Sequence, residues 1–97
     1  MSSKRQYWVY ILANLHNSVL YIGVTNNLQR RIFEHKAGIG SIFTKKYKVY
    51  KLVYFETTNN IHFALRREKQ LKAGSRVRKL SLINSVNPEW RDLYEKG

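Results

Sequence analysis

Two tyrosines occupy positions at which a β-hairpin would bring them together. Tyr10 lies in residues 6–13 and Tyr21 in residues 18–24, two runs that are rich in aromatic and β-branched residues. The residues between the runs have turn composition. We therefore expect a hairpin in which the two tyrosines lie directly opposite each other on one face, in a cleft and partly open to solvent. Two phenols side by side are a chemical feature, and the alternative is an aromatic pair that merely packs.

A guanidinium and an imidazole follow the second run on one helical face. Arg31 and His35 are four residues apart in a predicted helix at 28–37, so both project from the same side. A guanidinium suits a phosphate oxygen, and an imidazole can relay a proton. Because the connection from the second strand is short, this face can lie near the tyrosines. The alternative is a basic face that is simply exposed to solvent.

A carboxylate interrupts the apolar face of a second predicted helix at 61–73. The apolar positions of this helix are Ile61, Ala64, Leu65 and Leu71. Glu68 occupies the position that is missing from this stripe. A carboxylate there costs stability unless it is paired or holds a metal ion. Spacing alone is equally consistent with a metal ligand and with an ion pair between Glu68 and Lys72.

Charge points to a polyanionic partner. The 97 residues include 18 Lys and Arg against 6 Asp and Glu, a formal net charge of +12. Nucleic acid is the commonest polyanion, and an acidic membrane surface is the lesser alternative. Basic residues gather at 30–51 and 66–79, although charge runs are often only solvated faces. The candidate DNA contacts are Lys36, Lys45, Lys46, Arg67, Lys72 and Arg76.

Several classes of chemistry find no support in the composition. The chain has no cysteine, so disulfides and thiolate chemistry are excluded. Its three histidines lack metal-ligand spacing, and no glycine-rich phosphate loop is present. No apolar run approaches the roughly 18 residues of a membrane span. We expect a single cytoplasmic domain over residues 1–97 that makes no contact with a membrane.

The elements needed to position these residues form a small α+β fold. After the hairpin and the first helix, residues 41–48 are predicted to be a basic loop and residues 49–55 a third strand. Helices at 61–73 and 75–86 follow, and a short helical or turn segment at 89–94 ends the series. The order β-β-α-β-α-α predicts a three-stranded, antiparallel-type sheet flanked by helices.

Five segments together resemble a known family. Trp8-Val9-Tyr10 and Tyr21-Ile22-Gly23 resemble the paired motif of the GIY-YIG nuclease superfamily. Residues 28–36 resemble the helix that follows this motif, and residues 64–72 resemble the family's glutamate helix. Residues 87–93 resemble the ending of short, stand-alone bacterial members, the UPF0213 or YhbQ-like group. The resemblance covers nearly the whole chain and implies the same α+β fold.

The resemblance implies a site, residue by residue. The matched positions are Tyr10 and Tyr21 for the two tyrosines, Gly23 for the glycine, Arg31 for the arginine, His35 for the histidine of some branches and Glu68 for the metal ligand. For the family's asparagine we choose Asn87, with Asn84 as the second choice. Two positions depart from the pattern, because Trp8 replaces the first glycine and Val24 stands where some branches carry lysine.

The implied activity is that of a metal-dependent DNA endonuclease in repair, recombination or processing. Glu68 would hold one Mg²⁺ or Mn²⁺, Tyr10 would accept the proton of the attacking water, and Arg31 would stabilise the transition state. We expect Glu68 to point toward Tyr10 and Arg31 rather than outward to Lys72. Two rival hypotheses are a non-catalytic nucleic-acid-binding module, and a catalytic subunit that is active only in a complex whose protein partner supplies specificity. The DNA itself could be structured or single-stranded.

Overall fold

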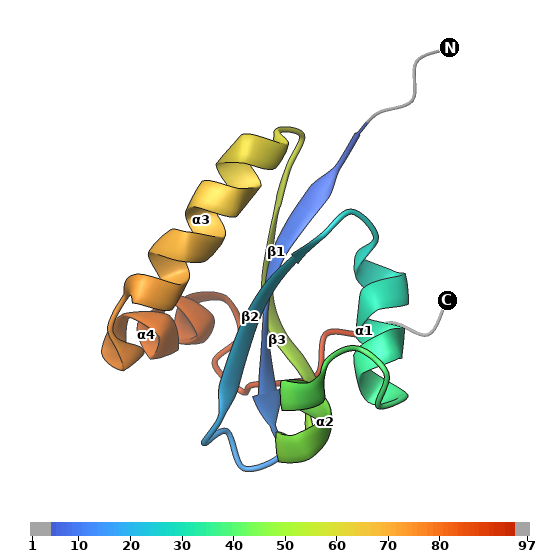
Figure 1. Ribbon diagram of the computed structural model, residues 1–97. Helices are drawn as coiled ribbons and strands as arrows, with labels where there is room; N and C mark the ends of the chain where they lie inside the picture. The colour runs from blue at the N-terminus through green and yellow to red at the C-terminus, as the bar shows by residue number, and fades with distance from the viewer. Residues whose placement is uncertain (1–4, 95–97) are drawn as a thin grey trace.

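The computed structural model describes residues 5–94 and contains a small sheet between two groups of helices (Figure 1). Its elements are β1 (Tyr7–Asn14), β2 (Leu20–Thr25), α1 (Leu28–Lys36), α2 (Ile42–Tyr47), β3 (Val49–Thr58), α3 (Ile61–Ala73) and α4 (Arg76–Val86). The predicted order of strands and helices is confirmed, with α2 as one added helix. Within the described residues no helix is long and apolar enough to cross a bilayer.

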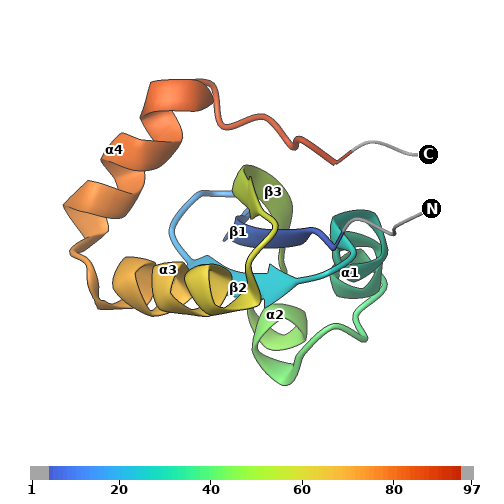
Figure 2. The same ribbon diagram turned by 90° about the horizontal axis from the view of Figure 1, so that it is seen from above.

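The sheet is three-stranded and antiparallel, with the order β2-β1-β3. Alternate residues of the central strand β1 face two separate cores. Val9 and Ile11 pack with the buried residues of α3 and α4, whereas Tyr10 and Leu12 pack with Ile32 of α1. Accordingly, α3 and α4 lie on one side of the sheet and α1 on the other (Figure 2). The α+β class predicted from the sequence is therefore confirmed.

The hairpin register differs from the predicted one by two residues. Tyr10 pairs with Gly23, and Tyr21 pairs with Leu12, so the two tyrosines are diagonal neighbours rather than directly opposed. The cause is Asn14, whose Oδ1 accepts hydrogen bonds from the backbone N–H of Ser18 (2.8 Å) and of Val19 (3.0 Å). This side chain closes a longer loop than the one expected. A shift of two residues preserves the face, so both phenols still lie on the same side of the sheet.

Residues 41–48, predicted to be a basic loop, contain the helix α2. Ser41 caps its first turn by accepting a hydrogen bond from the backbone N–H of Thr44 (3.1 Å). Lys48 ends the helix in the left-handed conformation, with φ of 56°. Thr44 is the buried residue of this short helix. Its position places α2 against the end of α1 that carries the histidine.

The segment after α4 runs back along β3 without forming a helix. The backbone N–H of Leu93 donates to the carbonyl oxygen of Leu52 (2.7 Å), and Asp92 accepts from the N–H of Leu52 (3.2 Å). Asp92 also pairs with Lys36 of α1. The helical or turn segment expected at 89–94 is thus an extended connection that joins β3 to α1, with a turn only at its start.

Candidate active site

Tyr10 is the buried centre of the site. Its side chain is 1% exposed, whereas the sequence predicted partial opening to solvent. The ring lies across Gly23 on the neighbouring strand, where a Cβ atom would stand 2.4 Å from the phenolic oxygen. Glycine at this position therefore leaves the space that the Tyr10 hydroxyl occupies.

The hydroxyl of Tyr10 begins a chain of buried polar groups. It lies 3.0 Å from His35 Nε2, and His35 Nδ1 lies 2.9 Å from the Thr44 hydroxyl. Both His35 and Thr44 are 0% exposed. Gly40 allows this close packing, because a Cβ there would lie 2.4 Å from Nδ1 of His35. Elements β1, α1 and α2 thus meet at one histidine.

Counting donors gives this chain a direction. The Arg31 guanidinium acts to lower the pKa of Tyr10, and a guanidinium can only donate hydrogen bonds. A neutral imidazole has one acceptor nitrogen, and we assign it to Nε2, so the phenol donates its own proton to Nε2 of His35. Nδ1 consequently carries the other proton and donates it to Thr44, whose hydroxyl donates to the carbonyl oxygen of Ser41 (3.3 Å). In this arrangement every donor of the chain has an acceptor, and the histidine tautomer is assigned from that network.

Burial moves the pKa values of Tyr10 and His35, the two titrating groups of this hydrogen-bonded series, away from neutral pH. Burial is the largest influence on Tyr10 and raises its pKa to about 12, while the hydrogen bond from Arg31 opposes the rise. Burial, followed by the charge of Arg31, lowers the pKa of His35 to about 4. At neutral pH the phenol is therefore protonated and the imidazole is uncharged.

Arg31 is held at the edge of this cluster. Its guanidinium donates to Glu34 (3.0 Å) and to the carbonyl oxygen of Gly40 (2.8 Å). The side chain remains partly exposed. A positive charge that acts on a buried phenol and also reaches solvent can meet a phosphate at this point.

Tyr21 extends the cluster toward the surface. Its ring centroid lies 6.3 Å from that of Tyr10 and 5.4 Å from that of His35, in an edge-on arrangement. Unlike Tyr10, it is half-buried. The structure thus brings together four predicted site residues, Tyr10, Tyr21, Arg31 and His35.

Glu68 pairs with a lysine and also acts electrostatically on Tyr10. Its carboxylate lies 3.1 Å from the amine of Lys72, so the expectation that it would turn away from Lys72 is wrong. Its negative charge nevertheless contributes to the raised pKa of Tyr10, which places the carboxylate within electrostatic range of the phenol. The side chain is mostly buried, as its position in the apolar stripe of α3 indicates.

The residues present fit one kind of metal site. No group of three or more His, Cys, Asp or Glu side chains within residues 5–94 could enclose an ion. Mg²⁺, however, commonly binds one or two carboxylates and completes its shell with waters and substrate phosphate oxygens. A single carboxylate at Glu68, within electrostatic range of Tyr10, fits such an ion but not a fully protein-enclosed one.

Asn87, predicted to be a catalytic residue, lies outside the cluster. Its amide nitrogen donates to the carbonyl oxygens of Val53 (3.0 Å) and Arg91 (2.9 Å), and its Oδ1 accepts from the N–H of Arg91 (3.1 Å). Val53 belongs to the core on the α3–α4 side of the sheet. Asn84, the second choice, accepts from the indole of Trp90. Both amides form hydrogen bonds with the segment after α4, and they do not face the phenols of Tyr10 and Tyr21.

The predicted DNA contacts divide into paired and unpaired groups. Lys36 pairs with Asp92, and Arg67 forms an ion pair with Glu56 at 2.8 Å. Arg76 donates to the carbonyl oxygen of Asn17. The remaining predicted contacts are Lys72, described above, and the two exposed lysines of α2, Lys45 and Lys46.

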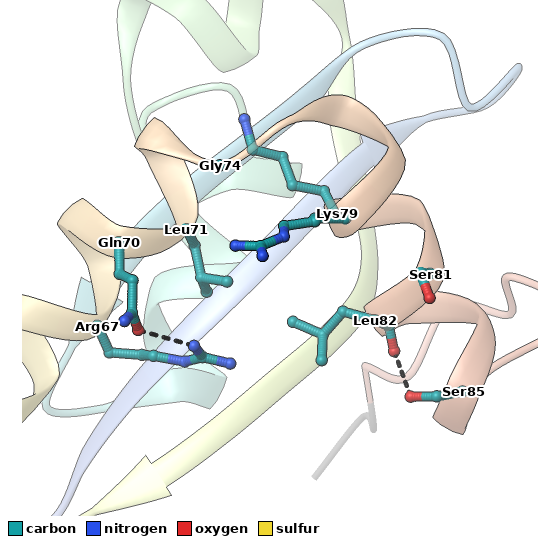
Figure 3. Close-up of a pocket in the computed structure, with 9 residues that line it drawn as sticks. Arg67, Gln70, Leu71, Gly74, Lys79, Ser81, Leu82 and Ser85 are labelled. Carbon is teal, nitrogen blue, oxygen red and sulfur yellow. Dashed lines mark hydrogen bonds between the residues drawn. The ribbon is translucent and has the colours of Figure 1, made fainter.

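A separate basic groove runs between α3 and α4 (Figure 3). Its volume is about 420 Å³, and Arg67, Arg78 and Lys79 are its cationic lining residues. Arg67 is hydrogen-bonded to Gln70 across one wall. The groove lies apart from Tyr10 and His35 and contributes positive charge rather than reactive groups.

Comparison with known proteins agrees with this geometry. Residues 6–81 match the model of the GIY-YIG catalytic domain. The chain belongs to the GIY-YIG family. A UPF0213 protein of Clostridium perfringens is 43% identical over 89 residues, which cover 92% of this chain and 94% of that protein. A UPF0213 protein of Syntrophus aciditrophicus is 41% identical over 83 residues, covering 84% and 93%.

A solved structure in the same group supports the fold. The solution NMR structure of a UPF0213 protein from Bacillus halodurans superposes with a TM-score of 0.57 at 29% identity, covering 90% of this chain and 92% of that one. The GIY-YIG family is a nuclease superfamily, and the part of this chain that matches its model includes the strands that carry Tyr10 and Tyr21.

Two residues of this GIY-YIG site were missed by sequence reasoning. Thr44 holds Nδ1 of His35, and Gly40 makes room for the imidazole ring. A signal for Thr44 was present, since Ser41 three residues earlier is a good helix cap. No local signal marks Gly40 as a site residue, because its requirement arises from contact with the His35 ring of α1.

Proposed function

We propose that this chain is a divalent-metal-dependent endonuclease that hydrolyses DNA phosphodiester bonds. The observation that carries the proposal is the buried hydrogen-bonded series from Tyr10 through His35 to Thr44, with the charge of Arg31 acting on the phenol. A tyrosine that merely packed would not need His35 and Thr44 buried with it in one hydrogen-bonded series, because burying polar groups costs stability. Membership of the GIY-YIG family supports the same reaction class.

Tyr10 and His35 would move the proton of the attacking water together. With a pKa of about 12, the phenol of Tyr10 is a proton-holding group at neutral pH and cannot act as a free phenolate. It can, however, take a proton from water while it passes its own proton to Nε2 of His35. His35 then becomes an imidazolium whose Nδ1–H stays on Thr44. This relay avoids a free phenolate in a buried site.

Arg31 and Glu68 would act on the phosphate. Arg31, whose charge acts on the phenol, would stabilise the negative charge of the transition state with its guanidinium. Glu68 would hold Mg²⁺ or Mn²⁺, which supplies charge stabilisation at the phosphate and at the leaving 3′ oxygen. Lys72, when released from Glu68, would contact a neighbouring phosphate. The products would carry 5′-phosphate and 3′-hydroxyl ends.

The test is nicking of supercoiled plasmid by the purified chain with Mg²⁺ or Mn²⁺. Wild type should nick, and Tyr10→Phe and Glu68→Gln should not, while both variants keep their fold and DNA affinity. Glu89→Gln is the matched control, because it removes a carboxylate from an exposed ion pair with Arg91. Glu68→Gln also breaks the Lys72 pair, but a pair of this kind contributes only about 0.3–0.5 kcal/mol.

Two outcomes would contradict the proposal. Glu68→Gln protein that nicks at the wild-type rate would remove Glu68 from the reaction. Folded wild-type protein that binds DNA but never nicks it would favour the non-catalytic binding module. Nicking that appears only after a protein partner is added would favour the subunit hypothesis.

A further inference from the structure

Three aromatic rings form a continuous row that begins at the candidate active site. The ring of Tyr21 lies against His35 and stacks on Phe43, with centroids 6.0 Å apart and an interplanar angle of 29°. Phe43 in turn contacts Tyr47, with centroids 4.8 Å apart. We call Tyr21, Phe43 and Tyr47 the aromatic row. It leads from the phenol cluster outward along α2.

The outer part of the aromatic row faces solvent. Phe43 is 41% exposed and Tyr47 is 45% exposed. The two residues are one helical turn apart on α2, and Thr44 is the residue that this helix buries. The two exposed rings therefore contact each other at the surface, and Phe43 also stacks on Tyr21, which packs against the core. Adjacent exposed rings of this kind mark a binding surface more often than scattered apolar side chains do.

Cations flank the aromatic row on both sides. A depression of about 330 Å³ lies beside it and is lined by Leu20, Tyr21, Ile22, Phe43, Lys72 and Lys79. On α2 itself, Lys45 and Lys46 are exposed, and the amine of Lys46 lies 5.4 Å from the centroid of the Tyr47 ring. Stacking rings bordered by lysines are what single-stranded nucleic acids bind: rings take the bases and lysines take the phosphates.

We propose that the aromatic row stacks an unpaired base of the DNA substrate, so that the enzyme prefers single-stranded or unpaired DNA to intact duplex. This inference rests on the proposed nuclease function and adds its substrate class. Within a duplex each base is already covered on both faces by its neighbours and cannot offer a face to Phe43 unless it is extruded. A strand stacked on Phe43 would run its backbone past Lys72, which borders both the depression and Glu68.

The composition of the surface argues against a protein occupant. The centre of a protein interface is depleted of charged residues, and lysine is among the residues it avoids. Here lysines stand beside the rings on α2, α3 and α4, and the chain carries a net charge of +12. A polyanion with flat apolar groups fits this surface better than a second folded protein does.

The experiment compares metal-free binding of a thymidine oligonucleotide and of a duplex of the same length, with fluorescence anisotropy as the readout. Wild type should bind the single strand more tightly. Phe43→Ala and Tyr47→Ala should each weaken single-strand binding, on the order of fivefold to 150-fold, and change duplex binding by no more than about twofold. Phe43→Trp should keep the preference, because it retains an aromatic face.

Two controls make the result specific. Phe63→Ala removes an exposed aromatic side chain from the first turn of α3, at the end of the molecule away from α2, and should leave both affinities unchanged (Figure 1). Phe43→Leu keeps apolar area but loses the ring, and should behave like Phe43→Ala. Thermal melting of each variant confirms that it is folded.

Three results would overturn the inference. The first is equal weakening of single-strand and duplex binding by Phe43→Ala, and the second is unchanged single-strand affinity in Phe43→Leu. The third is a change of oligomeric state in the Phe43 variants, which would make the row a contact between copies of the chain. Because binding is measured without metal, these results are independent of whether the wild-type protein nicks plasmid, so failure of the substrate class and failure of the nuclease proposal are distinguishable.

Discussion

The hydroxyl of Tyr10 lies where a side chain at residue 23 would begin, since a Cβ built on Gly23 falls 2.4 Å from it. The two residues are cross-strand partners in the hairpin. Glycine is therefore required at position 23 because any side chain there would occupy the space of the Tyr10 hydroxyl.

Gly23→Ala should displace the Tyr10 ring from His35 and abolish nicking. Because the clashing atoms belong to a buried ring held by hydrogen bonds, we expect a loss of about 1–3 kcal/mol in the free energy of unfolding. Chemical denaturation and the plasmid assay measure the two effects. Gly74→Ala is the matched control: its Cβ would meet backbone oxygens at 3.5 Å, an ordinary contact. Full activity in Gly23→Ala would contradict the role given to Tyr10.

His35 should make the protein less stable in mild acid. Its pKa is about 4 when folded and near 6.5 when unfolded, so the unfolded chain binds the proton more readily. Stability is therefore complete above pH 6.5 and falls as the pH drops toward 4, by up to about 3 kcal/mol. Urea denaturation across this range checks it. His35→Gln should flatten the profile, whereas exposed His62→Gln should leave it unchanged.

Glu56 is a second acid-sensitive group, and its effect on stability can be distinguished from that of His35 by the pH range in which it occurs. Arg67 and Tyr54 hold the pKa of Glu56 below the ordinary 4.5 against the opposing effect of burial. Its contribution to stability is present above pH 4.5 and is lost below it. A loss that begins only below pH 4.5 in wild type would therefore assign the acid sensitivity to Glu56 and contradict a buried neutral His35.

Thr44→Val should slow nicking without weakening DNA binding. The change keeps the shape of the side chain but removes the acceptor for Nδ1–H of His35, so the tautomer that receives the Tyr10 proton is no longer fixed. We expect kcat to fall, by up to the roughly 100-fold that a positioned acid–base group contributes, with KM unchanged. Thr44→Ser should retain activity. A rise in KM alone would show that Thr44 acts on substrate binding.

DNA affinity should fall steeply with salt, and the two α2 lysines should account for part of the slope. Lys45→Gln and Lys46→Gln should each reduce the slope of log affinity against log salt by about one. Lys36→Gln is the control, because its amine is already paired with Asp92. Equal slopes in all three variants and wild type would show that DNA does not contact α2.

Sequence reasoning recovered the elements better than the contacts between them. β-type composition and helix caps are local, so the order of strands and helices followed from short segments. The hairpin register depended on one side chain, Asn14, which lengthens the loop by bonding two backbone N–H groups. Composition alone does not distinguish this loop from a shorter one, although the period of two kept Tyr10 and Tyr21 on the right face.

Site residues could be predicted where the neighbouring sequence marks them as unusual. They could not be predicted where their role depends on a partner that is distant in the sequence. Glu68 stood out because it interrupts an apolar stripe, yet spacing could not reveal that it would pair with Lys72 and also influence Tyr10. Asn87 resembled a site residue, but a buried amide after a helix has backbone groups to satisfy first. Short polar helices such as α2 carry too little periodicity to be recognised before their contacts are known.

The connection after α4 has a practical consequence for dissecting the chain. The segment that matches the family model ends at residue 81, yet Ile83 beyond it is completely buried and Leu93 hydrogen-bonds to Leu52 of β3. A fragment trimmed to the matched segment would expose one core and release Asp92 from Lys36 on the other side of the sheet. Tags and fusions at this end of the fold therefore belong after residue 94, and a truncation at residue 81 should be recovered as unfolded or aggregated protein.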